Sequence, residues 1–298
     1  MFTIFLKSKF MKRNIFLTTG VFIVILFAAC KDKNNTTTPA RTDIHLDSNT
    51  VVGSHIVDKD GRTLYFFSND VNGGLSNCTG GCLTTFPIFN ADMTSTTFSG
   101  GLLASDFTTI TLSSGVPQTA YKGWPLYYYS PGGVAEPAGQ TNGEGVGNIW
   151  FVAKPNYSIM IANNQLTGAD GINYLSDYTP GDGLTNYLCD GNGNTLYIFI
   201  KDSAFINKFT KPDFSNNATF PVYETTNITV PSTLDKSLFV VTPFNGRNQL
   251  TYNGWPLYYF GADSLHRGSN KAVKFPPTQP AGAIWPVAIK GELPAPRQ

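Results

Sequence analysis

The sequence predicts an all-β protein built of two tandem, duplicated antiparallel domains, and three observations support this fold class. The aromatic phrase YKGWPLYYY at 121–129 returns almost unchanged as YNGWPLYYF at 252–260. Short aromatic and aliphatic runs alternate with Gly, Asn and Asp turn residues, a pattern typical of strands. No stretch after residue 30 shows a helical period with capping residues. The alternative is a single body of four propeller-like blades.

The N-terminal residues 1–29 have the pattern of a lipoprotein signal peptide. An apolar run from Ile15 to Ala29, short for a helix that spans a bilayer, follows the basic residues Lys7, Lys9, Lys12 and Arg13. The run ends in LFAAC, which resembles the lipobox of bacterial lipoproteins and makes Cys30 the lipidated residue. Met11 is an alternative start, and a buried N-terminal helix with Cys30 as a core thiol is the alternative structure.

Residues 30–43 continue as a polar segment without periodicity, which we expect to be a flexible tether. Lys31-Asp32 resembles the export signal that lipoproteins of Bacteroidetes use to reach the cell surface. We therefore expect a protein that is lipid-anchored in the outer membrane and exposed at the cell surface, with the periplasmic face as the alternative. The membrane is then one partner of the protein, through the lipid anchor.

The charge of the chain argues against a nucleic-acid partner. Removal of the signal peptide changes the formal charge from +1 to −3, because 17 basic residues then stand against 20 acidic ones. Such a chain lacks the basic footprint of a nucleic-acid-binding protein. Charged residues make up 14% of the chain, well below the roughly 25% of an average globular protein. This composition favours an exported, β-rich protein.

Self-similarity divides the chain into a first β-repeat domain at 44–168 and a second at 169–298. Upstream of the aromatic phrases, DGRTLYFFSND at 60–70 matches GNTLYIFIKD at 193–202. Each half is itself double, because TLYFFSND and PLYYYSPG are variants of one pattern. The chain therefore has the plan A-B-A-B.

The repeated strands are expected to build the core and, on one face, to offer aromatic rings for binding. In LYYYS the strand period of two places Leu126 and Tyr128 on one face and Tyr127 and Tyr129 on the other. Tryptophans recur in register with these strands and are expected in the interior of each unit; they are Trp124, Trp150, Trp255 and Trp285. The outward rings, for example Tyr127 with Tyr129, are the candidates for contact with sugars or other flat ligands.

The spacing Tyr-x-aromatic-x-x-Asp resembles the Yx(FWY)xxD motif of a bacterial family of secreted-repeat lipoproteins of unknown function. Three repeats carry the motif in full, as Tyr65-Phe67-Asp70, Tyr197-Phe199-Asp202 and Tyr258-Phe260-Asp263. The repeat with Tyr127 and Tyr129 departs from it, because Gly132 stands in the place of the acid. The resemblance covers nearly all of 45–290, and it implies no activity because the family has no established one.

The motif aspartates Asp70, Asp202 and Asp263 are expected to end turns by accepting local backbone N–H groups. The alternative is one cation site per repeat, made of carboxylate and carbonyl oxygens. A separate stretch, DGNGN at 190–194, resembles the start of a calcium loop. That loop would have Gly and Glu where this chain has Thr195 and Lys201, so we expect a turn and no metal there.

The cysteines of the mature chain give one expected disulfide and one buried thiol. Cys78 and Cys82 enclose Thr-Gly-Gly, and in an exported protein such a pair favours a disulfide that pins a loop. A metal site or a redox pair is the alternative. Cys189 aligns with Val57 of the first half, which favours a small buried side chain over a nucleophile.

The sequence favours a non-catalytic function. It contains no GxSxG, no HExxH and no phosphate-binding glycine loop, so we expect neither an enzyme nor a bound cofactor. Our first hypothesis is an interaction module at the cell envelope, an accessory subunit that docks on an outer-membrane complex. The alternatives are a protein that binds glycans or small aromatic ligands, and a lipoprotein that handles metal or redox equivalents.

Overall fold

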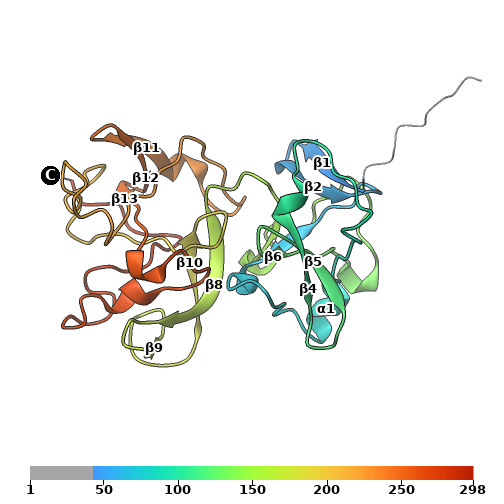
Figure 1. The fold of residues 1–298 in the computed structure, drawn as a ribbon, viewed down its shortest axis with the longest axis horizontal. Helices are drawn as coiled ribbons and strands as arrows, with labels where there is room; N and C mark the ends of the chain where they lie inside the picture. Colours follow the sequence, from blue (N-terminus) through green and yellow to red (C-terminus); the bar gives the residue numbers. More distant parts are fainter. Residues whose placement is uncertain (1–42, 298) are drawn as a thin grey trace, which may run out of the picture. The chain divides into compact units, whose positions relative to one another are not determined.

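A computed structural model describes residues 43–297 of the protein. The expected signal peptide at 1–29, the lipidated Cys30 and the tether up to residue 42 lie outside this range. The described residues lie in one compact unit that contains both repeats. Figure 1 traces the first repeat from blue to green and the second from yellow to red.

Short antiparallel strands make up the framework of both repeats (Figure 1). The first repeat contains β1 (Ile44–Asn49), β2 (Gly53–Asp58), β3 (Tyr65–Phe67), β4 (Phe107–Thr111), β5 (Pro117–Tyr121), β6 (Trp124–Pro125) and β7 (Trp150–Val152). The strands that follow are β8 (Met160–Thr167), β9 (Asn173–Tyr174), β10 (Leu184–Cys189), β11 (Phe239–Phe244), β12 (Arg247–Tyr252) and β13 (Trp255–Pro256).

The helices among the described residues are single turns. They are α1 (Gly81–Thr85) and the 3₁₀ turns η1 (Ser68–Asp70), η2 (Ala104–Asp106), η3 (Pro131–Gly133), η4 (Val146–Asn148), η5 (Lys236–Leu238), η6 (Gly261–Asp263) and η7 (Lys271–Lys274). None of the helices within 43–297 has the length and apolar character needed to cross a membrane.

The predicted all-β fold of tandem duplicated domains is confirmed. The sheet β4-β5-β6 of the first repeat has the same order and antiparallel pairing as β11-β12-β13 of the second. The sheets in the described part hold two or three strands each, whereas a propeller blade has four. The structure therefore supports tandem domains and not a four-bladed ring.

Strand pairing assigns β8 to the second repeat, although the sequence-based boundary after residue 168 leaves it in the first. All six residues of β10 pair with β8, in register from Leu184 opposite Gln165 to Cys189 opposite Met160. In the first repeat, β1 pairs with β2 in the corresponding way. The chain thus enters its second domain with β8, before the point at which the repeat is recognisable in the sequence.

A two-residue turn precedes β6 and β13, the strands that begin with Trp124 and Trp255, and fixes the position of each strand. Lys122-Gly123 joins β5 to β6, and Asn253-Gly254 joins β12 to β13, with positive φ at all four residues. This backbone is that of a type I′ turn, whose twist matches that of the flanking strands. The turns therefore bring Trp124 and Trp255 to equivalent places in the two repeats.

The four tryptophans lie in the interior of the protein. Their exposed fractions are 0% for Trp124, 4% for Trp150, 9% for Trp255 and 2% for Trp285. The ring of Trp150 stacks on Phe86 with 3.5 Å between centroids, and that of Trp285 stacks on Phe220 at 3.4 Å. The same pair of stacked rings therefore closes the core of each repeat.

Candidate functional site

The motif tyrosines are paired across each repeat by their own backbones. Tyr65 and Tyr127 exchange two N–H···O bonds, of 2.8 and 3.1 Å. Tyr197 and Tyr258 do the same at 2.9 and 3.0 Å. Each pair joins an A unit to a B unit, and all four tyrosines are fully buried.

Each motif tyrosine donates its hydroxyl to a carboxylate that follows the partner tyrosine. Tyr127 donates to Asp70 over 2.5 Å and Tyr258 donates to Asp202 over 2.7 Å. In the other direction, Tyr197 donates to Asp263 over 2.6 Å. The motif therefore connects the A and B units within each repeat, because the Tyr and the Asp of one motif belong to different hydrogen bonds.

Glu136 replaces the acid that is missing at Gly132. Tyr65 donates its hydroxyl to Glu136 Oε2 over 2.7 Å, so the fourth tyrosine has a carboxylate like the other three. The longer side chain reaches from a position further along the loop than the aspartates occupy. Glu136 could not be recognised from the motif, because the motif places its acid at a fixed spacing from the tyrosine. The sequence feature that could have indicated its role is that it is an acid shortly after the one repeat that lacks the motif aspartate.

The second oxygen of each carboxylate accepts a backbone N–H from the loop that follows. The donors are Asn77 to Asp70 (2.6 Å), Asn142 to Glu136 (2.6 Å), Lys208 to Asp202 (2.7 Å) and Lys271 to Asp263 (3.0 Å). The expected turn role is therefore seen, but over six to eight residues and combined with the tyrosine bond. Each carboxylate joins a motif tyrosine of one unit to a loop of the other.

Burial changes the protonation of these acids. It raises the pKa of Asp70 to about 6 and that of Asp202 to about 7, because a charged carboxylate loses its hydration inside the protein. Burial also raises the pKa of Asp263. Within residues 43–297 no three His, Cys, Asp or Glu side chains are grouped so that they could hold a metal ion. These acids are thus part of the scaffold.

The prediction that Tyr127 belongs to an outward binding face is wrong. Both faces of this strand are covered, so period two does not separate an inner from an outer side. Tyr127 is fully buried, and Tyr128 on the opposite face is half-buried and donates to Asp58 Oδ2 over 2.8 Å. Tyr129 is half-buried and packs against Phe86, with 5.0 Å between ring centroids.

The cysteines occupy two different environments. Cys78 and Cys82 form a disulfide that closes the loop before α1. Cys189 is a buried free thiol at the end of β10, and burial raises its pKa well above the usual value. A thiol of this kind is protonated, and hence a poor nucleophile, at neutral pH.

Arg267, which sequence analysis did not identify, joins the two repeats. Its guanidinium lies over the ring of Trp124, 4.6 Å from the centroid. It donates to the backbone oxygens of Val71 (3.0 Å), Lys122 (2.7 Å) and Asn192. Trp124 in turn donates its indole N–H to Gly191 O over 2.9 Å. The surface around Trp124 is therefore one of those by which the first repeat contacts the second.

The equivalent surface of the second repeat is partly exposed and carries apolar side chains. Trp255 donates its indole N–H to Leu293 O of the C-terminal segment over 2.8 Å. Phe205 donates its backbone N–H to Gly254 O over 2.7 Å, and Ala204 donates to Pro296 O over 2.9 Å. We call Ile200, Phe205, Ile206 and Leu293, which are 41%, 48%, 38% and 77% exposed, the Phe205 surface.

The backbone at Phe205 is unusual for an aromatic residue. Its φ is +61°, in the left-handed region that favours glycine. The corresponding residue of the first repeat is Gly73, which has φ +66° and lies beside Gly123 O as Phe205 lies beside Gly254 O. The second repeat thus places an exposed ring where the first has no side chain, at a cost in backbone strain.

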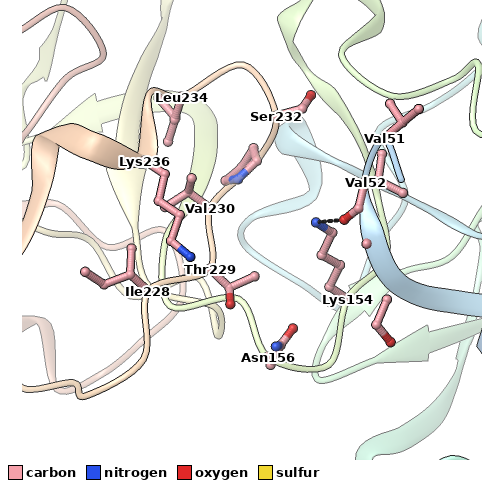
Figure 2. Close-up of a pocket in the computed structure, with 13 residues that line it drawn as sticks. Val51, Val52, Lys154, Asn156, Ile228, Thr229, Val230, Ser232, Leu234 and Lys236 are labelled. Carbon is pink, nitrogen blue, oxygen red and sulfur yellow. Dashed lines mark hydrogen bonds between the residues drawn. The ribbon is translucent and has the colours of Figure 1, made fainter. Parts of the chain in front are cut away.

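A groove with a volume of about 370 Å³ lies between the repeats, and Figure 2 shows its lining. The turn between β1 and β2 and the segment around Lys154 form one wall. The segment 228–236, which leads into η5, forms the other. Lys154 lies on one wall, with its ammonium group directed to Val52 O, and Lys236 lies on the other wall (Figure 2).

A second cleft, of about 510 Å³, is lined mainly by polar residues, and several of their amides are paired. The amides of Asn72 and Asn164 bond to each other at 3.2 Å. Asn270 donates to Gln165 O over 2.9 Å. The amides of this cleft therefore hold the loops of the two repeats together.

Residues 48–89 and 108–154 match the family model of a secreted repeat of unknown function. The two matched segments correspond to the A and B units of the first repeat, and the sequence-based resemblance is thereby confirmed. Searches of curated proteins and of solved structures found no match.

Proposed function

We propose that the chain, whose residues 48–89 and 108–154 match the model of a secreted repeat of unknown function, acts as a non-catalytic interaction module of the cell envelope. In this proposal the protein is an accessory subunit that docks on an outer-membrane protein complex. Cys30 carries the lipid anchor that holds it at the membrane. The Phe205 surface is the part that contacts the protein partner.

The use of the motif side chains supports a scaffold role for the repeats. The four tyrosines and their four carboxylates satisfy one another and the neighbouring backbone. Their burial leaves no reactive group of the motif in contact with solvent. Contact with other molecules is then made by the loops, which differ between the two repeats.

The position of the Phe205 surface is the observation that best supports docking on a protein partner. The first repeat uses the surface around Trp124 to bind another protein domain, namely the second repeat. In the second repeat the C-terminal segment covers Trp255, and Phe205 and Leu293 remain exposed to solvent. Exposed aromatic side chains are enriched where proteins bind one another.

The alternatives of a glycan and of a small aromatic ligand relied on outward tyrosine rings. That support is lost because Tyr127 is buried. The metal or redox alternative relied on Cys78 and Cys82 or on the repeat acids. In the disulfide neither Cys78 nor Cys82 offers a thiolate to a metal ion, and the acids are engaged by tyrosine hydroxyls and backbone N–H groups, so no observation favours this alternative. We therefore carry forward only the interaction module.

The proposal is tested by recovering the full, lipidated and tagged chain from its native envelope in mild detergent and identifying its partners by mass spectrometry. We expect an integral outer-membrane protein in stoichiometric amount. The variant Phe205→Gly should lose this partner while remaining folded, because glycine suits the backbone at this position. The control Val134→Ser changes a side chain that is 72% exposed in the first repeat, and it should retain the partner.

Two results would contradict the docking function. One is an eluate that contains only this chain. The other is equal recovery of the partner by Phe205→Gly and by the unmodified protein. The lipid anchor has a separate test, because Cys30→Ser should move the protein out of the membrane fraction without changing the fold of 43–297.

A further inference from the structure

We propose that the groove between the repeats binds a small organic anion, with a carboxylate held between Lys154 and Lys236 and an apolar portion against the surrounding side chains. This site is independent of the Phe205 surface. Loss of one function therefore leaves the other in place.

The charged lining of the groove is entirely positive. Lys154 and Lys236 are its two charged residues, and one comes from each wall. The ammonium group of Lys154 donates to Val52 O over 2.5 Å and forms no ion pair with a described residue. An ammonium group has three donors, so Lys154 keeps donors for a ligand.

Two acids near these lysines, Glu144 and Asp235, accept hydrogen bonds from neighbouring groups. Glu144 accepts from Val152 N over 2.6 Å and from Ser232 N over 3.1 Å, which ties the two walls together. Asp235, next to Lys236, accepts from both the N–H and the hydroxyl of Ser237. Neither acid lines the groove, and neither forms an ion pair with Lys154 or Lys236 among the described residues.

Burial lowers the pKa of one of the lysines, Lys154. Desolvation lowers the pKa of Lys154, and the charge of Lys236 lowers it further, whereas Glu144 acts in the opposite direction. A bound anion would relieve the repulsion between the two ammonium groups. This arrangement favours a ligand whose negative charge lies between them.

The remaining lining selects the size and polarity of the ligand. Val51 is 76% exposed and lies at one edge, while Ile228, Val230 and Leu234 line the opposite wall. The groove is at the small end of the range of ligand sites, roughly 300–1,000 Å³. An aliphatic or aromatic carboxylate of a few carbon atoms fits both the charge and the apolar wall.

Hydrogen–deuterium exchange of the full chain, with hexanoate as the probe, tests this site. Hexanoate should slow exchange in the segments 51–54 and 228–236. Acetate has the charge without the apolar part, and hexan-1-ol has the apolar part without the charge. Both should require a concentration at least about fivefold higher for the same protection, since a hydrogen bond to a charged group adds considerably to binding.

Variants of the exposed Lys236 distinguish the site from general detergent effects. Lys236→Gln should weaken the effect of hexanoate by about fivefold or more, whereas Lys236→Arg should retain it. The control Lys201→Gln removes an exposed lysine elsewhere and should change nothing. Equal protection by hexanoate and hexan-1-ol, no protection by hexanoate, or an unchanged response in Lys236→Gln would each overturn the proposal.

Discussion

Tyr65 and Tyr127 exchange both of their backbone hydrogen bonds, yet their hydroxyls reach carboxylates in different loops, Glu136 and Asp70. One residue pair thus ties together two strands and two loops. The second repeat has the same arrangement with Tyr197 and Tyr258. The motif therefore links the A and B units of a repeat. The contribution of this link to the stability of the protein can be tested in either repeat.

Removal of one tyrosine hydroxyl should destabilise the protein. Tyr258→Phe leaves Asp202 Oδ2 without its buried donor, at an expected cost of about 1–3 kcal/mol in the free energy of unfolding. Urea unfolding followed by fluorescence measures this change. Tyr129→Phe is the matched control, because the Tyr129 hydroxyl makes no hydrogen bond to the described residues, and its unfolding midpoint should not move. Equal midpoints for both variants would contradict the role of the tyrosine–carboxylate bond.

The buried acids should make stability fall as the pH rises from about 4 to 7. The pKa of Asp202 is about 7 in the folded protein, against about 3.9 in an unfolded chain. Between these values the folded state binds more protons than the unfolded state, so deprotonation favours unfolding. The contribution of Asp202 is complete below pH 4 and is lost as the pH passes 7.

Asp202→Asn isolates this effect from the other titrating groups. The variant should lose stability through its weaker acceptor, but its free energy of unfolding should depend less steeply on pH between 4 and 7. Unfolding curves in a pH series provide the comparison. A variant as steeply pH-dependent as the unmodified protein would show that Asp202 is not the titrating group.

Replacement of Arg267 should uncouple the two repeats. Arg267→Ala removes three donors to backbone oxygens and exposes the ring of Trp124, at an expected cost of about 2–3 kcal/mol. Arg267→Lys should not restore the loss, because an ammonium group cannot reproduce the planar set of donors. Calorimetry should then show two separate transitions in place of one. Arg247→Ala, which breaks an exposed ion pair to Glu224, should cost less than about 1 kcal/mol.

The backbone at Phe205 and Gly73 gives a paired prediction. Phe205→Gly relieves a strain of about 1–2 kcal/mol, which the greater freedom of glycine in the unfolded chain partly offsets by about 1 kcal/mol. Thermal unfolding should therefore show equal or slightly higher stability. Gly73→Ala should be destabilised, because a Cβ there would lie 3.0 Å from Arg267 Nε and 3.2 Å from Gly123 O. Destabilisation by Phe205→Gly would mean that the ring is held by packing within the protein.

Much of the fold was predictable because both the repeat and its turns depend on residues that are close together in the sequence. The turns Lys122-Gly123 and Asn253-Gly254 lie next to strands that the aromatic runs identify. The buried tryptophans recur at equivalent places, so their shared environment could be inferred from spacing alone. Period and turn chemistry are local properties and need no knowledge of the tertiary contacts.

The residues that were missed depend on contacts between distant segments. Glu136 performs the role of a motif acid from outside the motif, and Arg267 reaches three backbone oxygens in different loops. Nothing near either residue in the sequence marks these contacts. Tyr127 was assigned to the wrong environment because alternation separates inner from outer residues only where one face of a strand meets solvent. Here other units cover both faces.

The C-terminal segment covers Trp255 as the second repeat covers Trp124, since Leu293 O and Gly191 O accept the two indole N–H groups. The tail thus serves as an end cap of the kind that arrays of stacked repeats require. The Trp255 indole thus has its acceptor within its own repeat, whereas the Trp124 indole has its acceptor in the other repeat.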